Sequence, residues 1–121
     1  LEATGRSFPA SLKRAVIAFR DERDWKPFHD VRNLAMGLSI EGAELLERFL
    51  WKSDTEITAM LGGEGAEGVR HELADVFVYL LYLSEATGID LSAAVREKIA
   101  LNAIKYPAEK ARGSNRKYTE L

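Results

Sequence analysis

The segment between Gly68 and Gly88 constrains the fold more than any other part of this sequence. It contains about nineteen residues with neither glycine nor proline. Its centre, residues 76–83, is rich in residues typical of strands, but the whole segment is much longer than an ordinary strand. We therefore predict a buried helix over residues 69–87, apolar on nearly all sides, with Gly88 at its C-terminal end.

The rest of the chain is also predicted to be helical. Apolar residues recur at helical spacing in residues 10–23, 31–51 and 91–106, and Asp30 and Asp90 are suitable N-caps for the last two segments. No strand remains, so the expected fold class is all-α: a four-helix bundle, up-and-down or a variant of it. The 121 residues suffice for one domain, in which residues 1–8 and 108–121 are irregular extensions.

The two remaining segments connect these helices. Ser53 begins a predicted short helical turn that ends near Met60, and the residues around Pro27 form a turn. Four glycines within residues 62–68 predict a flexible loop, which lacks the lysine of a phosphate-binding P-loop.

Composition excludes several classes of function. The net charge is −2 and the pI about 5.7, so the chain has no electrostatic footprint for nucleic acid or for an anionic membrane surface. Cysteine is absent, which excludes disulfides, thiolate metal sites and cysteine nucleophiles. The longest apolar run is too short to cross a bilayer and no signal-peptide pattern opens the sequence, so a cytoplasmic protein is expected.

A carboxylate interrupts the apolar face of the helix predicted over residues 31–51. At about 100° per residue, Leu34, Leu38 and Leu45 share one stripe, and Glu41 falls in its middle. Glu44 lies one turn further on, at the edge of the same face. A buried carboxylate is costly unless something pairs with it, so these two acids require an explanation.

The helix predicted over residues 69–87 repeats this pattern. Glu72 and Asp75 lie one turn apart on a face that continues as apolar. Four converging carboxylates would repel one another, and a hard divalent cation with oxygen ligands removes the repulsion. Because no histidine follows a glutamate by three residues, Mg²⁺ or Mn²⁺ is favoured over iron or zinc. The alternative for any single acid is a paired residue at a helix edge, and Glu47, which points away from the stripe, is a secondary candidate.

Aromatic and polar residues at helix ends suggest a place for a ligand. Trp25 and Trp51 flank the second predicted helix, where a nucleobase could stack, although tryptophans are more often core or interface anchors. For four further candidate ligand residues a purely structural role is the alternative. They are His29, Tyr79, Asn102 in the middle of an apolar stripe, and Lys98 at its edge.

In combination these residues resemble a known family. E-x-x-E at residues 41–44 and E-x-x-D at residues 72–75 are similar to the metal signature of the all-α NTP pyrophosphatases, the MazG-like superfamily. The similarity is greater to one branch, the dCTP pyrophosphatases. It covers nearly the whole chain from about Leu12. The segments that carry it are residues 22–25, 28–29, 32–34, 41–47, 51–54, 72–76, 79–80, 106–107 and 116–121.

The resemblance implies a function and assigns roles. It implies Mg²⁺-dependent hydrolysis of a nucleoside triphosphate to the monophosphate and pyrophosphate, as in sanitation of the nucleotide pool, by a homodimer or homotetramer. The metal ligands that it implies are Glu41, Glu44, Glu72 and Asp75, and Glu41 or Glu44 would activate the attacking water. Trp25 and Trp51 match residues that sandwich the base, and Tyr79 and Asn102 match residues near the sugar and phosphates. Lys98 and the basic tail are candidates for neutralising pyrophosphate.

Two departures from the family pattern bear on the substrate. Ile40 stands where a glutamate often precedes the first ligand, and residues 14–17 lack the histidine that dCTP-specific members carry near the base. The expected substrate is dCTP or a 5-modified dCTP. The alternatives are another or broader set of deoxynucleotides, for example dUTP, and a helical oligomer that binds nucleotide without hydrolysing it.

Overall fold

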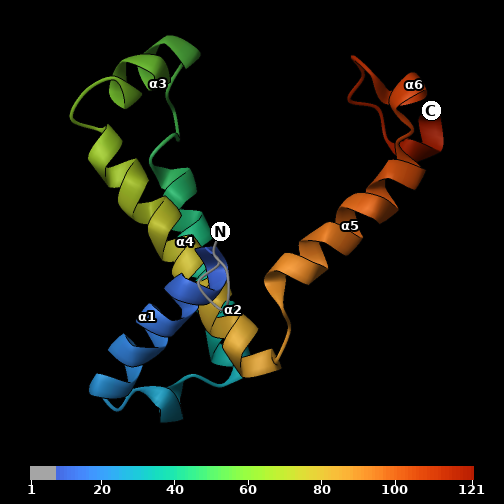
Figure 1. Cartoon of the computed structure of the whole chain (residues 1–121). Helices are drawn as coiled ribbons and strands as arrows, with labels where there is room; N and C mark the ends of the chain where they lie inside the picture. The colour runs from blue at the N-terminus through green and yellow to red at the C-terminus, as the bar shows by residue number, and fades with distance from the viewer. Residues whose placement is uncertain (1–7) are drawn as a thin grey trace. The chain divides into compact units, whose positions relative to one another are not determined.

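The described part of the computed structural model comprises residues 8–121, and its regular secondary structure is entirely helical (Figure 1). It contains no strand within these residues, which confirms the all-α class. The lead-in predicted for residues 1–8 lies, apart from Phe8, outside the described residues. The elements are α1 (Phe8–Glu22), η1 (Lys26–Phe28), α2 (Val31–Glu47), α3 (Asp54–Leu61), α4 (Ala66–Thr87), α5 (Leu91–Lys105), α6 (Ala108–Ala111) and η2 (Tyr118–Glu120).

The chain divides into two compact units at Gly88. In the first unit α4 is central, because α2, α1 and α3 all pack against it. Its buried apolar side chains are Leu34 from α2 and Val69, Leu81 and Tyr82 from α4. The long segment that lacks glycine and proline is thus the helix around which the other helices of this unit are arranged.

The predicted capping residues are confirmed. The Asp30 carboxylate accepts a hydrogen bond from the main-chain N–H of Asn33 at 2.8 Å, and Asp90 caps α5 in the same way at 3.1 Å. Ser53 opens α3 with a complete capping box, and Gly88 ends α4 with a φ of +73°. Each cap satisfies main-chain groups that a helix end otherwise leaves unpaired.

Several predicted boundaries were wrong. The second helix ends at Glu47 rather than near residue 51. After it the N–H groups of Arg48 and Phe49 donate to carbonyls three residues back, at 3.2 and 2.9 Å, as in a turn, and Trp51 then has a φ of +63°. The glycine-rich loop is shorter than predicted, since α4 already begins at Ala66. The turn near Pro27 contains the short helix η1, in which the proline occupies a favourable first position.

The C-terminal segment is more ordered than predicted. It contains α6 and η2 instead of irregular structure alone. Within the second unit the rings of Tyr106 and Tyr118 meet edge to face at 6.1 Å, and the Lys105 ammonium lies 5.0 Å from the Tyr118 ring. These contacts hold the end of the chain against the end of α5.

Helix α5 buries none of its residues. Several large apolar side chains are each more than half exposed along it: Val95, Ile99, Leu101 and Ile104. Of the described helices, none is by itself both long and apolar enough to cross a membrane, although α4 and α5 taken together would meet that criterion by length and composition.

Candidate active site

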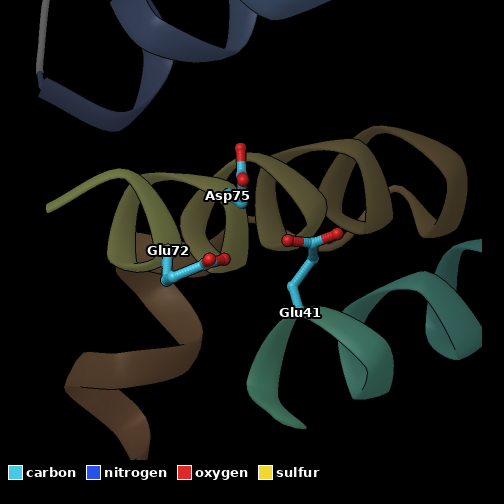
Figure 2. Close-up of side chains that lie close together, drawn as sticks. All are labelled: Glu41, Glu72 and Asp75. Atoms are coloured by element: carbon cyan, nitrogen blue, oxygen red, sulfur yellow. The ribbon is translucent and has the colours of Figure 1, made fainter. Parts of the chain in front are cut away.

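Three of the four predicted carboxylates come together where α2 packs on α4. Glu41 offers one oxygen, and Glu72 and Asp75 each offer another, all within 4.8 Å of one another. Figure 2 shows Glu41 projecting from α2 toward α4, which carries the other two side chains. Such a set of oxygen donors from neighbouring helices suits a hard divalent cation.

Hydrogen bonds do not neutralise the negative charges of these three carboxylates. Burial raises the pKa of Glu41, and the negative charges of Glu44, Asp75 and Glu72 raise that pKa further. Glu41 Oε1 and Glu72 Oε1 are buried and have no hydrogen-bond partner. Buried carboxylate oxygens without a donor fit a metal site, since a bound cation would satisfy both at once.

Glu44 occupies a neighbouring position instead of joining this group. It lines an adjoining cavity of about 340 Å³ together with Glu47, Arg48 and Glu72. Glu72 therefore contributes to both spaces. Glu47 is exposed and faces the same cavity as Glu44.

Arg48 is a feature of the site that the sequence reasoning missed. Its guanidinium lies 3.0 Å from Glu72 Oε2, and this carboxylate belongs to a residue that is only 8% exposed. The signal available in the sequence was spacing: Arg48 follows Glu44 by four residues and therefore adjoins it at the helix end.

A second cavity, of about 380 Å³, is lined almost entirely by aromatic rings. It brings together three predicted ligand residues, Trp25, His29 and Tyr79. The sequence reasoning missed its other four lining residues, which are Phe19, Phe28, Val78 and Tyr82. Their signal was position: the two phenylalanines flank the Trp25 turn, and Tyr82 follows Tyr79 by three residues on α4.

Edge-to-face ring contacts give the aromatic cavity its shape. The Trp25 ring meets Phe19 at 5.8 Å, and Tyr82 contacts both His29 at 4.5 Å and Tyr79 at 6.2 Å. Flat apolar walls of this kind are suited to stacking a planar heterocycle.

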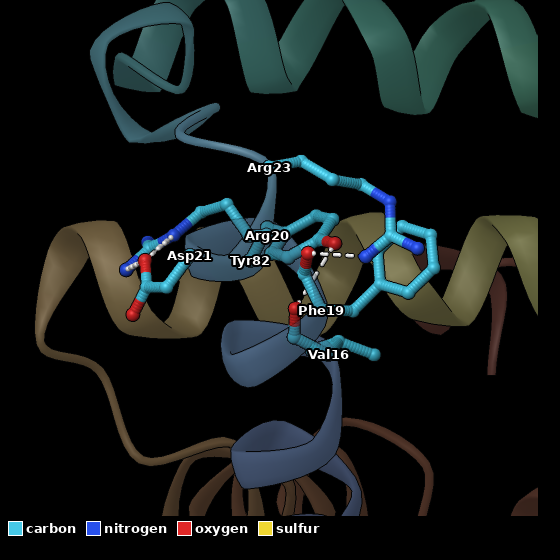
Figure 3. A network of polar contacts seen from close by, with 6 residues as sticks. All are labelled: Val16, Phe19, Arg20, Asp21, Arg23 and Tyr82. Carbon is cyan, nitrogen blue, oxygen red and sulfur yellow. Dashed lines mark hydrogen bonds and ion pairs between the residues drawn. The ribbon is translucent and has the colours of Figure 1, made fainter.

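A hydrogen bond behind the cavity joins α1 to α4, and further polar contacts lie along the end of α1 (Figure 3). The Tyr82 hydroxyl donates to the Val16 carbonyl at 3.2 Å, and the Arg23 guanidinium lies 3.6 Å from the centre of the Phe19 ring. The nearby guanidinium of Arg20 is buried and pairs with Asp21.

His29 is the polar group of the aromatic cavity. Burial lowers its pKa, and the positive charge of Arg20 lowers it further, so the neutral imidazole is favoured. Its Nδ1 is buried and has no hydrogen-bond partner.

Three predicted ligand residues do not line this cavity. Trp51 is 96% exposed, and Lys98 and Asn102 belong to α5 in the second unit. Their predicted contacts with a ligand stay predictions.

Known proteins are similar to this chain in sequence and in fold. Residues 37–121 match the MazG-like family, and the chain belongs to that family. It is 41% identical over 118 residues to human dCTP pyrophosphatase 1 and 43% identical over 112 residues to the mouse protein of the same name. Both matches cover 91% of this chain but only 65% of the length of those relatives.

A solved structure extends the similarity to the fold. The crystal structure of a pyrophosphatase from Archaeoglobus fulgidus matches with a TM-score of 0.74 and 41% identity. The match covers 80% of this chain and 90% of the archaeal chain.

Proposed function

We propose that this chain is a Mg²⁺-dependent nucleoside triphosphate pyrophosphohydrolase that converts dCTP, or a 5-modified dCTP, to the monophosphate and pyrophosphate. The single observation that carries this proposal is the carboxylate group beside the aromatic cavity on one helix. Asp75 and Tyr79 are four residues apart on α4, so the two sites adjoin on the same face of that helix. A cation-bound triphosphate and a stacked base therefore fit one ligand.

The residues divide the work as follows. Glu41, Glu72 and Asp75 hold the cation, with Glu44 as a fourth ligand, and Mg²⁺ (or Mn²⁺) would supply charge neutralisation and a more acidic bound water. Glu44 or Glu41 orients the attacking water and accepts its proton. Trp25, His29 and Tyr79 hold the base and sugar. For Trp51, Lys98 and Asn102 the proposed contacts with the nucleotide rest on the resemblance to the family alone.

The composition of this site explains why positioning carries most of the rate. Hydrolysis of a phosphoanhydride needs charge stabilisation and an in-line water more than covalent chemistry by the protein. The aromatic cavity holds the base at one end, and a cation held by the carboxylates would bind the triphosphate at the other. Base preference then depends on the polar atoms of the cavity, of which His29 is one.

The names of the relatives support dCTP as the substrate, and one sequence feature bears on how exclusive that preference is. Residues 14–17 contain no histidine, and Val16 instead supplies a carbonyl to Tyr82. A panel of the four canonical deoxynucleotides, dUTP and 5-methyl-dCTP, compared by kcat/KM, tests the substrate. We expect dCTP and its 5-modified form to be preferred; equal values for all would reject cytosine preference.

The same assay separates an enzyme from a nucleotide-binding protein. Chromatography should detect dCMP and pyrophosphate, and excess EDTA should abolish both. Glu44→Gln and Asp75→Asn should each remove turnover without unfolding the protein. Binding of dCTP without product formation would support the non-catalytic alternative.

We also propose that the chain acts as a homodimer or homotetramer in the cytoplasm, with residues 1–121 forming one functional domain and no nucleic-acid polymer as partner. The exposed apolar side chains of α5 support an oligomer, since a helix that buries none of its residues gains stability from a partner. Multi-angle light scattering of the full chain measures the oligomeric state directly.

A further inference from the structure

We propose that Arg48 is a positioning residue of the metal site: it holds one oxygen of Glu72 so that the other is presented to the cation. This inference rests on the proposed function only to the extent that the carboxylate group binds a divalent cation. The resemblance to the pyrophosphatases assigned no role to Arg48, and neither did the carboxylate pattern.

The two oxygens of Glu72 have different surroundings. Oε2 accepts from the Arg48 guanidinium at 3.0 Å, whereas Oε1 is buried and has no partner. A carboxylate held at one oxygen loses much of its rotational freedom, so the direction of the second oxygen is determined as well. Partners of this kind orient metal ligands in many proteins, and their loss costs about 10–100-fold in metal affinity.

Gly68 supplies the space in which the guanidinium lies. A Cβ at residue 68 would lie 2.6 Å from the Arg48 Cζ, closer than these atoms can approach, so the flexible guanidinium end would have to move. Gly68 precedes Glu72 by four residues on α4 and so lies on the same face. Substitution of this glycine by alanine should therefore displace Arg48 from Glu72 while leaving its positive charge in the molecule.

A positioning role and a purely electrostatic role of Arg48 predict opposite changes in metal affinity when Arg48 is removed. A positive charge beside a cation site repels the cation, so a purely electrostatic Arg48 would weaken metal binding, and its removal would tighten it. A positioning Arg48 strengthens metal binding, and its removal would weaken it. Gly68→Ala distinguishes the two roles further, because it moves the Arg48 charge away from Glu72 without removing it from the protein.

The test measures cation binding by the full chain without nucleotide. Mn²⁺ is titrated alone, and the free ion is followed by electron paramagnetic resonance. We expect about 10-fold weaker Mn²⁺ binding for both Arg48→Met and Gly68→Ala. Arg48→Lys, which keeps the charge and one donor group, should recover part of the loss.

Matched controls account for charge and helix propensity. Arg70→Met removes an arginine from α4 whose side chain is 75% exposed and pairs with Glu67 of the same helix. Gly42→Ala adds a methyl group in α2 where nothing lies within 4 Å. Both should bind Mn²⁺ like the unchanged protein. Thermal unfolding of each variant, followed by circular dichroism, establishes that it is folded.

The outcomes separate this inference from the proposed function. Unchanged or tighter Mn²⁺ binding by Arg48→Met, or unchanged binding by Gly68→Ala, would overturn the positioning role even if dCTP is hydrolysed. The expected losses in a protein that hydrolyses no nucleotide would support the role and reject the proposed enzyme. Absence of Mn²⁺ binding by the unchanged protein would overturn both.

Discussion

One carboxylate oxygen of Glu41 lies within 4.8 Å of one from Asp75, although the two residues belong to different helices. The packing of α2 on α4 brings these like charges together in a partly buried place. Burial, followed by Glu44, Asp75 and Glu72, raises the pKa of Glu41 above its usual value of 4.5. The folded protein consequently holds this proton more tightly than the unfolded chain does.

The first prediction concerns Glu41→Gln. In metal-free protein at pH 7 the substitution should raise the free energy of unfolding by about 1–3 kcal/mol, because it removes one member of a like-charge cluster. The sign follows from the raised pKa: the contribution of Glu41 to stability is present below pH 4.5 and is lost as the pH rises through the folded-state pKa. Urea unfolding at pH 4 and pH 7 measures the difference, which should be larger at pH 7.

Added Mg²⁺ should make the unchanged protein more stable than Glu41→Gln, which reverses the order expected without metal. Mg²⁺ at about 100 times its dissociation constant stabilises a binding protein by about 2.7 kcal/mol, whereas Glu41→Gln should gain little. Asp30→Asn, which changes an exposed cap, serves as a charge control. An equal response of Glu41→Gln and the unchanged protein to Mg²⁺ would remove Glu41 from the metal site.

The second prediction concerns Gly37 of α2, which lies against the Tyr79 ring of α4. A Cβ here would overlap the Tyr79 ring, with Cζ at 2.6 Å. Gly37→Ala should destabilise the protein by about 1 kcal/mol, because overpacking of about 1–3 kcal/mol exceeds the gain in helix propensity of about 1 kcal/mol. Gly42→Ala, with open space around it, should instead stabilise by about that gain, as measured by thermal unfolding.

Gly37→Ala should also affect the substrate. Displacement of Tyr79 changes a wall of the cavity, so KM for dCTP should rise while the oligomeric state is preserved. A stabilised Gly37→Ala protein with an unchanged KM would mean that the ring has room to move away.

The third prediction concerns Trp51, which combines a φ of +63° with an exposed fraction of 96%. A left-handed conformation costs a non-glycine residue about 1–2 kcal/mol, and this side chain gains no compensating burial in the described chain. Trp51→Gly should raise stability by about 1 kcal/mol. If Trp51 stacks on the base, the same variant should bind dCTP about 10-fold more weakly.

Trp51→Phe is the matched variant for stacking. It keeps the left-handed strain and an aromatic face, so it should retain most of the affinity for nucleotide with little change in stability. Equal KM values for the glycine and phenylalanine variants would exclude Trp51 from the base site.

The fourth prediction concerns pH and His29. Burial and then Arg20 lower its pKa below 6.5, so the unfolded chain binds this proton more readily than the folded protein. The contribution of His29 to stability is therefore present above pH 6.5 and is lost as the pH falls toward the folded-state pKa. His29→Phe should show a smaller loss of stability between pH 7.5 and pH 5, as measured by urea unfolding.

The difference in stability between His29→Phe and the unchanged protein reports His29 alone, because the Glu41 contribution, which has the opposite sign, is the same in both. His29→Phe also keeps a ring against Tyr82, which His29 contacts at 4.5 Å. Parallel pH profiles for the two proteins would show that His29 does not titrate differently on folding.

Helix identity and helix ends were predictable because their causes are local. The length of the segment before Gly88 and the caps at Asp30, Ser53 and Asp90 depend on residues within a few positions of one another. The same periodicity indicated that Glu72 and Glu41 lie on inward faces, and they are buried and half-buried; Asp75, predicted on the same face as Glu72, is exposed. The end of α2 was misplaced, since no residue type marks the change to turn-type hydrogen bonds after Glu47.

The sequence by itself determined the all-α class, the helical spacing of the two acid pairs and the resemblance to the MazG-like family, because periodicity and motif spacing are properties of the chain. Only the tertiary structure decided which groups meet. Packing of α2 on α4 separated Glu44 from the three-carboxylate group and placed Arg48 on Glu72. Packing of α1 on α4 added Phe19 and Tyr82 to the aromatic cavity. Such contacts join residues far apart in the chain, and local periodicity carries no information about them.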